Sequence, residues 1–248
     1  MKIKLFTALL FLLSLSSYAT SKSPVRIHSH NDYRQLVPFY QAYSQQVHSI
    51  EADLYLSPAD PEQLVVAHDR EELETAPTFE KLYVQPLVEL FRRNNGKAWA
   101  HSNEIPDLLI DIKSDREQVM QLLVKQLDLY PEVFNPAINP FAVRIIISGD
   151  IPSPGTFHTY PEYISFDGLI HIHYTPEQLK RIALFSEPFR KHSVWNGKGS
   201  IIAAEKKETG RNYSESPFAR EAHPFLGKPG FHDRMEHLLF YGNRLYQH

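Results

Sequence analysis

Cysteine is absent from this sequence of 248 residues. A disulfide scaffold, catalysis by a thiol and attachment through a lipid-modified cysteine are therefore excluded. A basic footprint is missing too, because the formal net charge is −3. Nothing in the charge balance therefore indicates nucleic acid as a partner. The chain also lacks short repeats and low-complexity tracts, and its length suits one large domain.

The first residues have the pattern of a secretory signal. A basic start, "MKIK", precedes the apolar segment "LFTALLFLLSL", and "SYA" ends at Ala19 with the small residues of a cleavage site. The apolar segment is short for a membrane span, although an N-terminal anchor is the alternative. We expect residues 1–19 to be removed, leaving a secreted or periplasmic chain without a stable membrane span.

Beyond the signal, strand-like and helix-like stretches alternate along the chain. Strands are predicted over 25–30, 48–56, 63–68, 107–113, 142–148 and 163–170, and helices over 37–47, 79–95, 115–130 and 175–186. Thr175 followed by Pro176 is a typical helix start, and Pro86 indicates a kink or a boundary. Strands that alternate with helices predict a parallel sheet with helical crossovers, as in an α/β barrel.

The strand "SIEADLYL" directs two carboxylates to the same side. Glu51 and Asp53 share one face, whereas the other face is apolar. Without a partner, the two carboxylates would repel each other and would be costly to desolvate. A positive group is therefore expected between them.

Further polar side chains occur at or near the ends of other predicted strands. In a barrel, chemistry is placed on the inward residues at the C-terminal ends of the strands. Because these polar side chains lie on four separate predicted strands, we predict that they meet in one common site. The residues expected there are Glu51, Asp53, Asp111, His30, His68 and Lys113.

The residue types indicate the chemistry. Carboxylates without a cysteine ligand suit one hard divalent cation, Mg²⁺ or Ca²⁺. Two imidazoles suit a general base and a general acid, and a lysine beside them can pair with an anionic phosphate. Together these groups predict metal-assisted phosphoryl transfer.

Each residue also has a plainer interpretation when it is taken alone. His30 or His68 could be a hydrogen-bonded structural histidine, and Lys113 could be a solvated surface residue. An aspartate at the end of a strand often forms a turn or caps a helix. Their joint placement favours the site. The histidines that we take as structural or solvent-facing are His101, His158, His171, His173 and His192.

The order of the motifs resembles the glycerophosphodiester phosphodiesterase superfamily, which belongs to the phospholipase-C-like phosphodiesterases. The motifs are His-Asn-Asp at 30–32, Glu-Ala-Asp at 51–53, His-Asp at 68–69 and "LLIDIKSD" at 108–115. The closest likeness is to the branch named after altered inheritance of mitochondria protein 6, in which "HSHNDY" and "EADL" are typical. The resemblance covers roughly residues 25 to 205.

This resemblance implies a (β/α)₈ barrel that hydrolyses a phosphodiester, such as a glycerophosphodiester or a lysophospholipid headgroup, with one Mg²⁺ or Ca²⁺. It makes His30 the expected base and His68 the expected acid, although the sequence does not decide between the two roles. By resemblance, the metal ligands are Glu51, Asp53 and Asp111, the catalytic residues are His30 and His68, and the substrate contacts are Lys113 and Asn31.

Some positions depart from the usual family pattern. The Arg-Gly after the first histidine is Asn31-Asp32 here, the glutamate common after that turn has no counterpart, and the third carboxylate is Asp111 rather than glutamate. These departures bear on glycerol specificity more than on phosphodiester chemistry. The alternatives are a secreted pseudoenzyme that binds metal or phosphate without turnover and a structural domain whose carboxylates hold Ca²⁺.

The C-terminal tail is foreign to this pattern. Residues 208–248 show little strand or helix periodicity, so the seventh and eighth strands are expected to be missing or replaced by an irregular segment. Permitted codons for this tail, read one nucleotide later, can encode two helices and the strands "KPIRFW" and "IDYINT". We therefore expect an incomplete barrel over 20–207 and a frameshift product over 208–248, which would leave the chain unstable or inactive.

Overall fold

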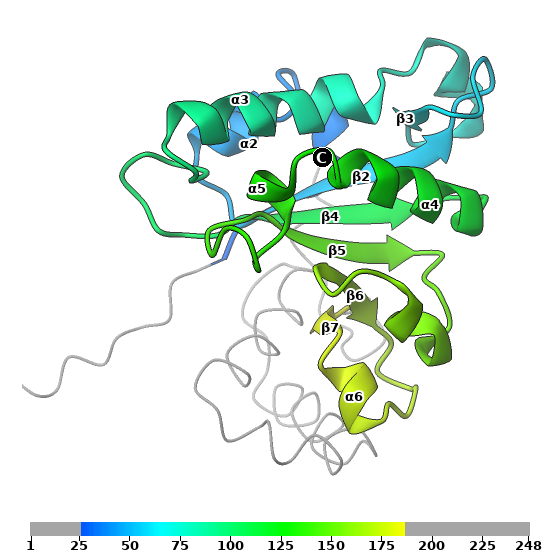
Figure 1. The fold of residues 1–248 in the computed structure, drawn as a ribbon. Coiled ribbons are helices and arrows are strands. Elements are labelled where there is room, and N and C mark those ends of the chain that lie inside the picture. Colours follow the sequence, from blue (N-terminus) through cyan, green and yellow to red (C-terminus); the bar gives the residue numbers. More distant parts are fainter. Residues whose placement is uncertain (1–25, 187–248) are drawn as a thin grey trace, which may run out of the picture.

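The computed structural model describes residues 26–186 (Figure 1). The predicted signal over 1–19 lies outside the described residues. The tail over 208–248, with its proposed frameshift, and His192 lie outside them as well.

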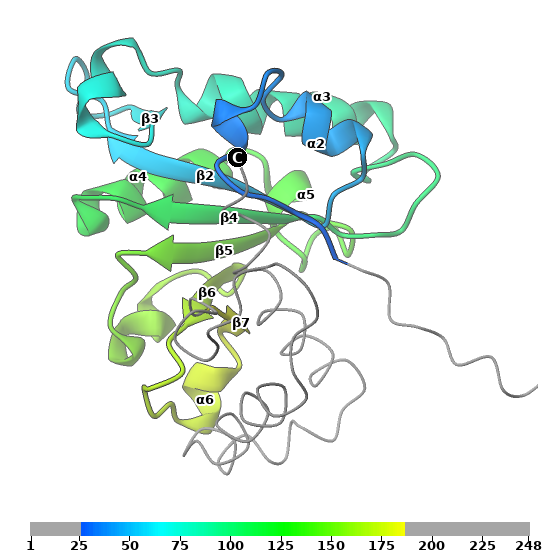
Figure 2. The same cartoon turned by 180° about the vertical axis from the view of Figure 1, so that it is seen from behind.

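A curled, mostly parallel sheet forms the centre of the structure (Figures 1 and 2). Its parallel strands follow the order β1-β2-β4-β5-β6-β7, and β3 pairs with β2 in the antiparallel sense. The strands are β1 (His28–Ser29), β2 (Ser49–Leu56), β3 (Leu64–Val66), β4 (Asp107–Ile112), β5 (Arg144–Gly149), β6 (Ile164–Gly168) and β7 (Ile182–Phe185). The predicted α/β class is confirmed as a half-barrel, and the expected absence of the barrel's last two strands stays a prediction, because residues 187–248 lie outside the described part of the chain.

Helices pack against the apolar face of this sheet. Ala52 and Leu54 of β2 and Ile110 of β4 are buried in the same core as Phe91 of α3 and Leu123 of α4. Because side chains alternate along a strand, Glu51, Asp53 and Asp111 take the opposite face. The helices are α2 (Tyr40–Ser44), α3 (Gln85–Arg93), α4 (Arg116–Leu127), α5 (Pro131–Phe134) and α6 (Pro176–Leu179).

Two predicted elements differ from those in the structure. The strand expected over 63–68 exists as β3, but it turns back on β2 instead of entering the parallel series, because the short link from β2 permits only an antiparallel return. The helix expected over 175–186 ends at Leu179, and Ile182–Phe185 form β7 beside β6. An apolar run of four residues fits either element, and pairing with β6 decides in favour of the strand.

Other boundaries agree with the sequence patterns. The Thr175 side chain accepts a hydrogen bond from the Gln178 backbone N–H, as a helix cap does. Pro86 lies in the first turn of α3, directly after a π-helical turn over Glu80–Val84. Proline fits there because its missing N–H is not needed in the first turn of a helix. The predicted boundary at Pro86 is therefore confirmed.

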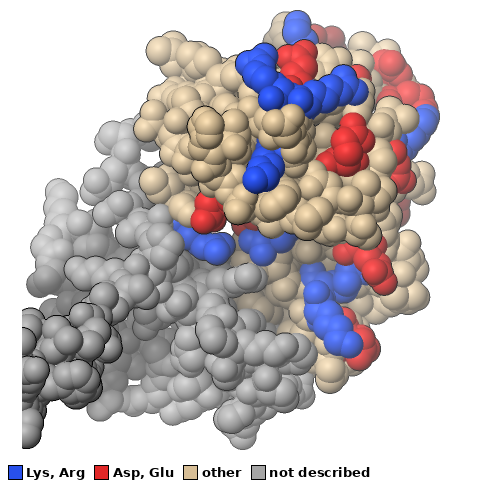
Figure 3. Space-filling model, turned by 60° about the vertical axis from the view of Figure 1, so that its left-hand side comes forward, with Lys and Arg blue, Asp and Glu red and all other residues tan. Residues whose placement is uncertain are grey.

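The described surface shows no broad area of one charge in the view of Figure 3, where basic and acidic side chains are interspersed. None of the helices within residues 26–186 combines the length and hydropathy that a membrane crossing requires.

A buried carboxylate ties the last strands together. Asp167 of β6 accepts hydrogen bonds from the Ser148 hydroxyl at 2.9 Å and from the Ser186 backbone N–H at 2.9 Å. Burial raises the pKa of Asp167 to about 6, although the hydrogen bonds from the two serines oppose this rise. The native state therefore holds the proton of Asp167 more tightly than the unfolded chain does.

We predict that Asp167→Asn changes how stability depends on pH. A carboxyl with a raised native pKa contributes stability in full below its unfolded pKa, and this contribution is lost as the pH rises through about 6. Relative to the variant, the wild type should lose about 1 kcal/mol between about pH 5 and about pH 8. Urea unfolding at both pH values measures this. Asp128→Asn, at an exposed carboxylate, is the control, and parallel pH profiles for wild type and Asp167→Asn would contradict the prediction.

Candidate metal centre

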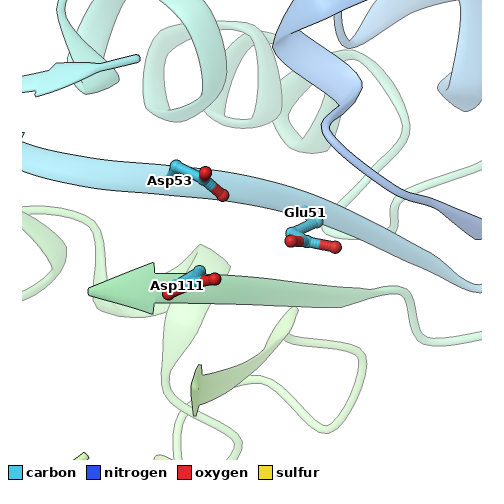
Figure 4. A group of neighbouring side chains, drawn as sticks. All are labelled: Glu51, Asp53 and Asp111. Carbon is cyan, nitrogen blue, oxygen red and sulfur yellow. The ribbon is translucent and has the colours of Figure 1, made fainter. Parts of the chain in front are cut away.

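Three carboxylates converge where β2 and β4 run side by side. Asp53 lies opposite Asp111 in the strand register, and Glu51 lies two residues earlier on β2. One oxygen of each carboxylate lies within 4.8 Å of the others, and Figure 4 shows the three side chains together. Glu51 and Asp53 are buried. The predicted convergence of these carboxylates is therefore confirmed, and the triad could hold a metal ion whose identity is not fixed by this geometry.

The two oxygens of Asp53 have different surroundings. Oδ2 lies 2.8 Å from the Tyr33 hydroxyl, 2.9 Å from Lys113 Nζ and 3.3 Å from His68 Nδ1. Oδ1 is buried and has no hydrogen-bond partner among the described residues. An unsatisfied carboxylate oxygen in the interior is costly. Oδ1 is therefore the atom that a divalent cation would satisfy, and the donor set consists of the oxygens that Mg²⁺ and Ca²⁺ prefer.

Asp111 lies against a glycine of the neighbouring strand. Gly149 ends β5 with a φ of +73°, and a Cβ atom there would overlap Asp111 Oδ1. A larger residue would therefore have to displace the carboxylate. Burial raises the pKa of Asp111, the charges of Asp53 and Glu51 raise it further, and Lys113 partly offsets these effects. This concentration of negative charge again favours a cation.

Lys113 reaches into the same cluster from the residue after β4. Its Nζ lies 2.7 Å from Asp111 Oδ2 and 2.9 Å from Asp53 Oδ2. Burial lowers the pKa of Lys113, but the hydrogen bonds and charges of the two aspartates outweigh burial and raise it above its ordinary value. The side chain therefore stays an ammonium group, placed as the sequence predicted.

Glu51 is bordered by two histidines. His28 Nε2 lies 2.7 Å from Glu51 Oε2, and His30 Nε2 lies 3.8 Å from Glu51 Oε1. Burial raises the pKa of Glu51, but the hydrogen bond from His28 and the charges of His28, His30 and Lys113 bring it below its ordinary value. Glu51 is therefore ionised at neutral pH. The role of His28 was not predicted from the sequence, although His28 and His30 share one face of their strand, which was the available signal.

The two predicted catalytic histidines contact different ligands of the triad. His30 lies beside Glu51, and His68 lies beside Asp53. Their side chains are 33% and 37% exposed, whereas that of Asp53 is fully buried. Both imidazoles could therefore meet a substrate that approaches the carboxylates from solvent. The histidines that we took as structural or solvent-facing, within the described residues, are exposed: His101, His158, His171 and His173.

Asp32 has a structural role. It is fully buried, and its oxygens accept hydrogen bonds from the Ser29 hydroxyl, the Phe39 backbone N–H and the Tyr83 hydroxyl. These bonds fold the loop after β1 back on itself. The aspartate that replaces the usual family glycine therefore anchors the loop, and removing it would leave three donors without an acceptor.

Asn31 and Tyr33 extend from this anchored loop into the site. Asn31 has a φ of +46°, a left-handed conformation that asparagine tolerates better than most residues. Its side-chain oxygen lies 3.3 Å from the Tyr33 hydroxyl, which in turn contacts Asp53 and His68. Asn31 thus lies beside the triad, whereas Tyr33 was not identified from the sequence.

Comparison with known proteins agrees with this geometry. Residues 17–133 match the model of the AIM6-like phosphodiesterase domain. This segment is therefore similar to an AIM6-like phosphodiesterase domain. The matched segment contains the carboxylate triad, both predicted catalytic histidines and Lys113. The resemblance inferred from the motifs is therefore confirmed for this branch.

Several curated proteins are similar to part of this chain. The chain is 32% identical over 149 residues to altered inheritance of mitochondria protein 6 of Eremothecium gossypii, covering 52% of this chain and 38% of that protein. It is 31% identical over 122 residues to a homolog from Arthroderma benhamiae, covering 42% and 38%. A relative from Lachancea thermotolerans is 26% identical over 177 residues, covering 59% and 41%. The chain thus spans about two-fifths of the length of these relatives.

We predict that Asp53→Asn lowers the affinity of the protein for Mg²⁺, Ca²⁺ or Mn²⁺ by roughly tenfold or more, because metal affinity follows the charge of the ligand set. Titration calorimetry on the full chain measures this. Asp107→Asn is the matched control, since Asp107 is also a buried carboxylate but pairs with Arg144 at the start of β4. Equal affinities for the wild type and Asp53→Asn would show that the triad is not the metal centre.

Proposed function

We propose that this protein hydrolyses a phosphodiester with the help of one divalent cation. The observation that carries the proposal is the buried triad of Glu51, Asp53 and Asp111 with a partly exposed imidazole beside Glu51 and another beside Asp53. The family supports the reaction class, since the matching domain is a phosphodiesterase domain. The substrate would accordingly be a small molecule or a lipid headgroup.

Different side chains would contact the phosphate in different ways. A bound Mg²⁺ or Ca²⁺, held by the triad, would act as a Lewis acid towards the phosphate oxygens. The Lys113 ammonium, already fixed against the carboxylates, supplies a second positive charge for the diester. Asn31 offers its amide from the adjacent loop. These groups hold the phosphate between the histidines.

The two histidines move the protons. In our assignment, His30 removes a proton from the attacking water or hydroxyl, and His68 protonates the leaving alcohol. Both imidazoles reach solvent, so both can meet the substrate. Neither role needs a nucleophilic side chain, which fits a sequence without cysteine.

The substrate class proposed here is a glycerophosphodiester or a lysophospholipid headgroup. The loop after the first histidine carries Asn31-Asp32, and the Asp32 carboxylate is engaged with Ser29, Phe39 and Tyr83. It therefore does not offer a contact to a glycerol hydroxyl. We further propose that the protein works outside the cytoplasm, because the first residues have a signal pattern.

We predict that His30→Ala and His68→Ala each lower kcat by about a hundredfold or more, the usual scale for losing a positioned acid or base. Release of the alcohol from glycerophosphocholine and from lysophosphatidylcholine, with and without a chelator, measures the activity. His101→Ala is the control, because this exposed histidine lies in the loop before β4. A histidine variant with near-normal turnover would remove that residue from the mechanism.

Because the tail over 208–248 is expected to impair the protein, the same assay should compare two forms of the chain. One form is the chain as printed, and the other carries the alternative reading after Lys207. If only the second form hydrolyses the diester, the barrel residues carry the activity and the tail over 208–248 abolishes it. Metal binding without turnover in either form would contradict the proposal and favour the pseudoenzyme.

A further inference from the structure

The Tyr33 hydroxyl brings together three side chains of the candidate site. It lies 2.8 Å from Asp53 Oδ2, 3.1 Å from His68 Nδ1 and 3.3 Å from Asn31 Oδ1. These residues come from different elements, since Asp53 is on β2, His68 follows β3 and Asn31 precedes a short turn over Asp32–Arg34. One hydroxyl thus connects a predicted metal ligand, a predicted catalytic residue and a predicted substrate contact.

The direction of these hydrogen bonds follows from the number of protons. Tyr33 has one hydroxyl proton, and a carboxylate without a proton can only accept. A phenol hydroxyl keeps its proton at neutral pH. Tyr33 therefore donates to Asp53 Oδ2, its shortest contact, and its oxygen lone pairs remain available as acceptors.

The tautomer of His68 follows in turn. Nδ1 lies 3.1 Å from the Tyr33 oxygen and 3.3 Å from Asp53 Oδ2. Since the Tyr33 hydroxyl donates its hydrogen bond to Asp53, the tyrosine oxygen and Asp53 Oδ2 can both only accept a hydrogen bond from this nitrogen. Nδ1 must then carry a proton, because a lone pair there would face two oxygens. In neutral His68, Nε2 is consequently the nitrogen with the lone pair.

The backbone of His68 is fixed separately from its ring. Its N–H donates to Glu72 Oε2 at 2.9 Å, and its carbonyl oxygen accepts from the Tyr55 hydroxyl at 3.2 Å. These bonds place the residue but leave the tautomer undetermined. Of the two groups that hold Nδ1, Asp53 already serves Lys113 and Tyr33 through the same oxygen. The Tyr33 oxygen is therefore a second acceptor for His68 Nδ1, in addition to the shared oxygen of Asp53.

We infer that Tyr33 is a positioning residue that holds His68 in the Nδ1–H tautomer, so that Nε2 is the atom that exchanges a proton with the substrate. This inference rests on the proposed function for its chemical meaning. The tautomer itself can be measured without any turnover. Loss of the hydroxyl should slow the proton transfer while leaving the binding of the phosphate largely unchanged.

The decisive experiment is ¹⁵N NMR of the full chain labelled at histidine, recorded at a pH where His68 is neutral, with His68→Gln used to assign its signals. In the wild type, His68 should be the Nδ1–H tautomer. In Tyr33→Phe, which removes only the hydroxyl, the share of the Nε2–H tautomer should rise. A wild-type His68 in the Nε2–H form would overturn the inference, and so would identical His68 signals in the wild type and Tyr33→Phe.

Tyr163→Phe is the matched control. Its hydroxyl also donates to a carboxylate, Asp128, at 2.7 Å, but Tyr163 lies directly before β6, and within residues 26–186 no hydrogen bond joins its hydroxyl to the candidate site. This variant loses a comparable hydrogen bond and should leave the His68 signals as they are in the wild type. A change as large as that in Tyr33→Phe would assign the effect to general loosening and overturn the inference.

Kinetics supplies the second readout. With an active form of the protein, Tyr33→Phe should lower kcat by roughly tenfold or more and change KM by less than about twofold. A rise in KM at unchanged kcat would contradict a positioning role. If no form hydrolyses a diester, the proposed function fails, whereas the NMR result still decides whether Tyr33 sets the tautomer of His68.

Discussion

The site depends on one carboxylate, Asp53, which is fully buried between the sheet and the loop after β1. Its Oδ2 accepts from Tyr33 and Lys113 and lies near His68, whereas its Oδ1 has no partner among the described residues. The first oxygen organises the surrounding side chains, and the second is left for a cation. A buried charge of this kind is stable only if both needs are met.

The strand register and the close packing of Gly149 against Asp111 produce this arrangement. Parallel pairing of β2 with β4 sets Asp53 opposite Asp111, and the face that carries them is opposite the one that packs on α3 and α4. Gly149 provides the space in which the Asp111 carboxylate lies. Asp32, fully buried, fixes the loop from which Asn31 and Tyr33 extend. The acidic cluster therefore depends on backbone geometry at several points that carry no chemistry themselves.

The sequence allowed the carboxylates to be predicted because they lie on strands with strict alternation, where a shared face follows from spacing alone. It did not reveal Tyr33, which lies on a loop whose path depends on tertiary hydrogen bonds to Asp32. Nor did it separate β3 from the parallel strands, since local pattern does not specify a pairing partner. The short apolar run of β7 was mistaken for the end of a helix, because four residues carry too little periodicity to distinguish the two.

The central claim is that Glu51, Asp53 and Asp111 hold a divalent cation. The most direct test is a crystal structure of the full chain grown with Mn²⁺, with the ion located by its anomalous scattering. The account predicts one peak within about 2.5 Å of an oxygen from each of the three carboxylates, with Asp53 Oδ1 among them. A well-occupied Mn²⁺ elsewhere, with Lys113 alone neutralising Asp53 and Asp111, would contradict it.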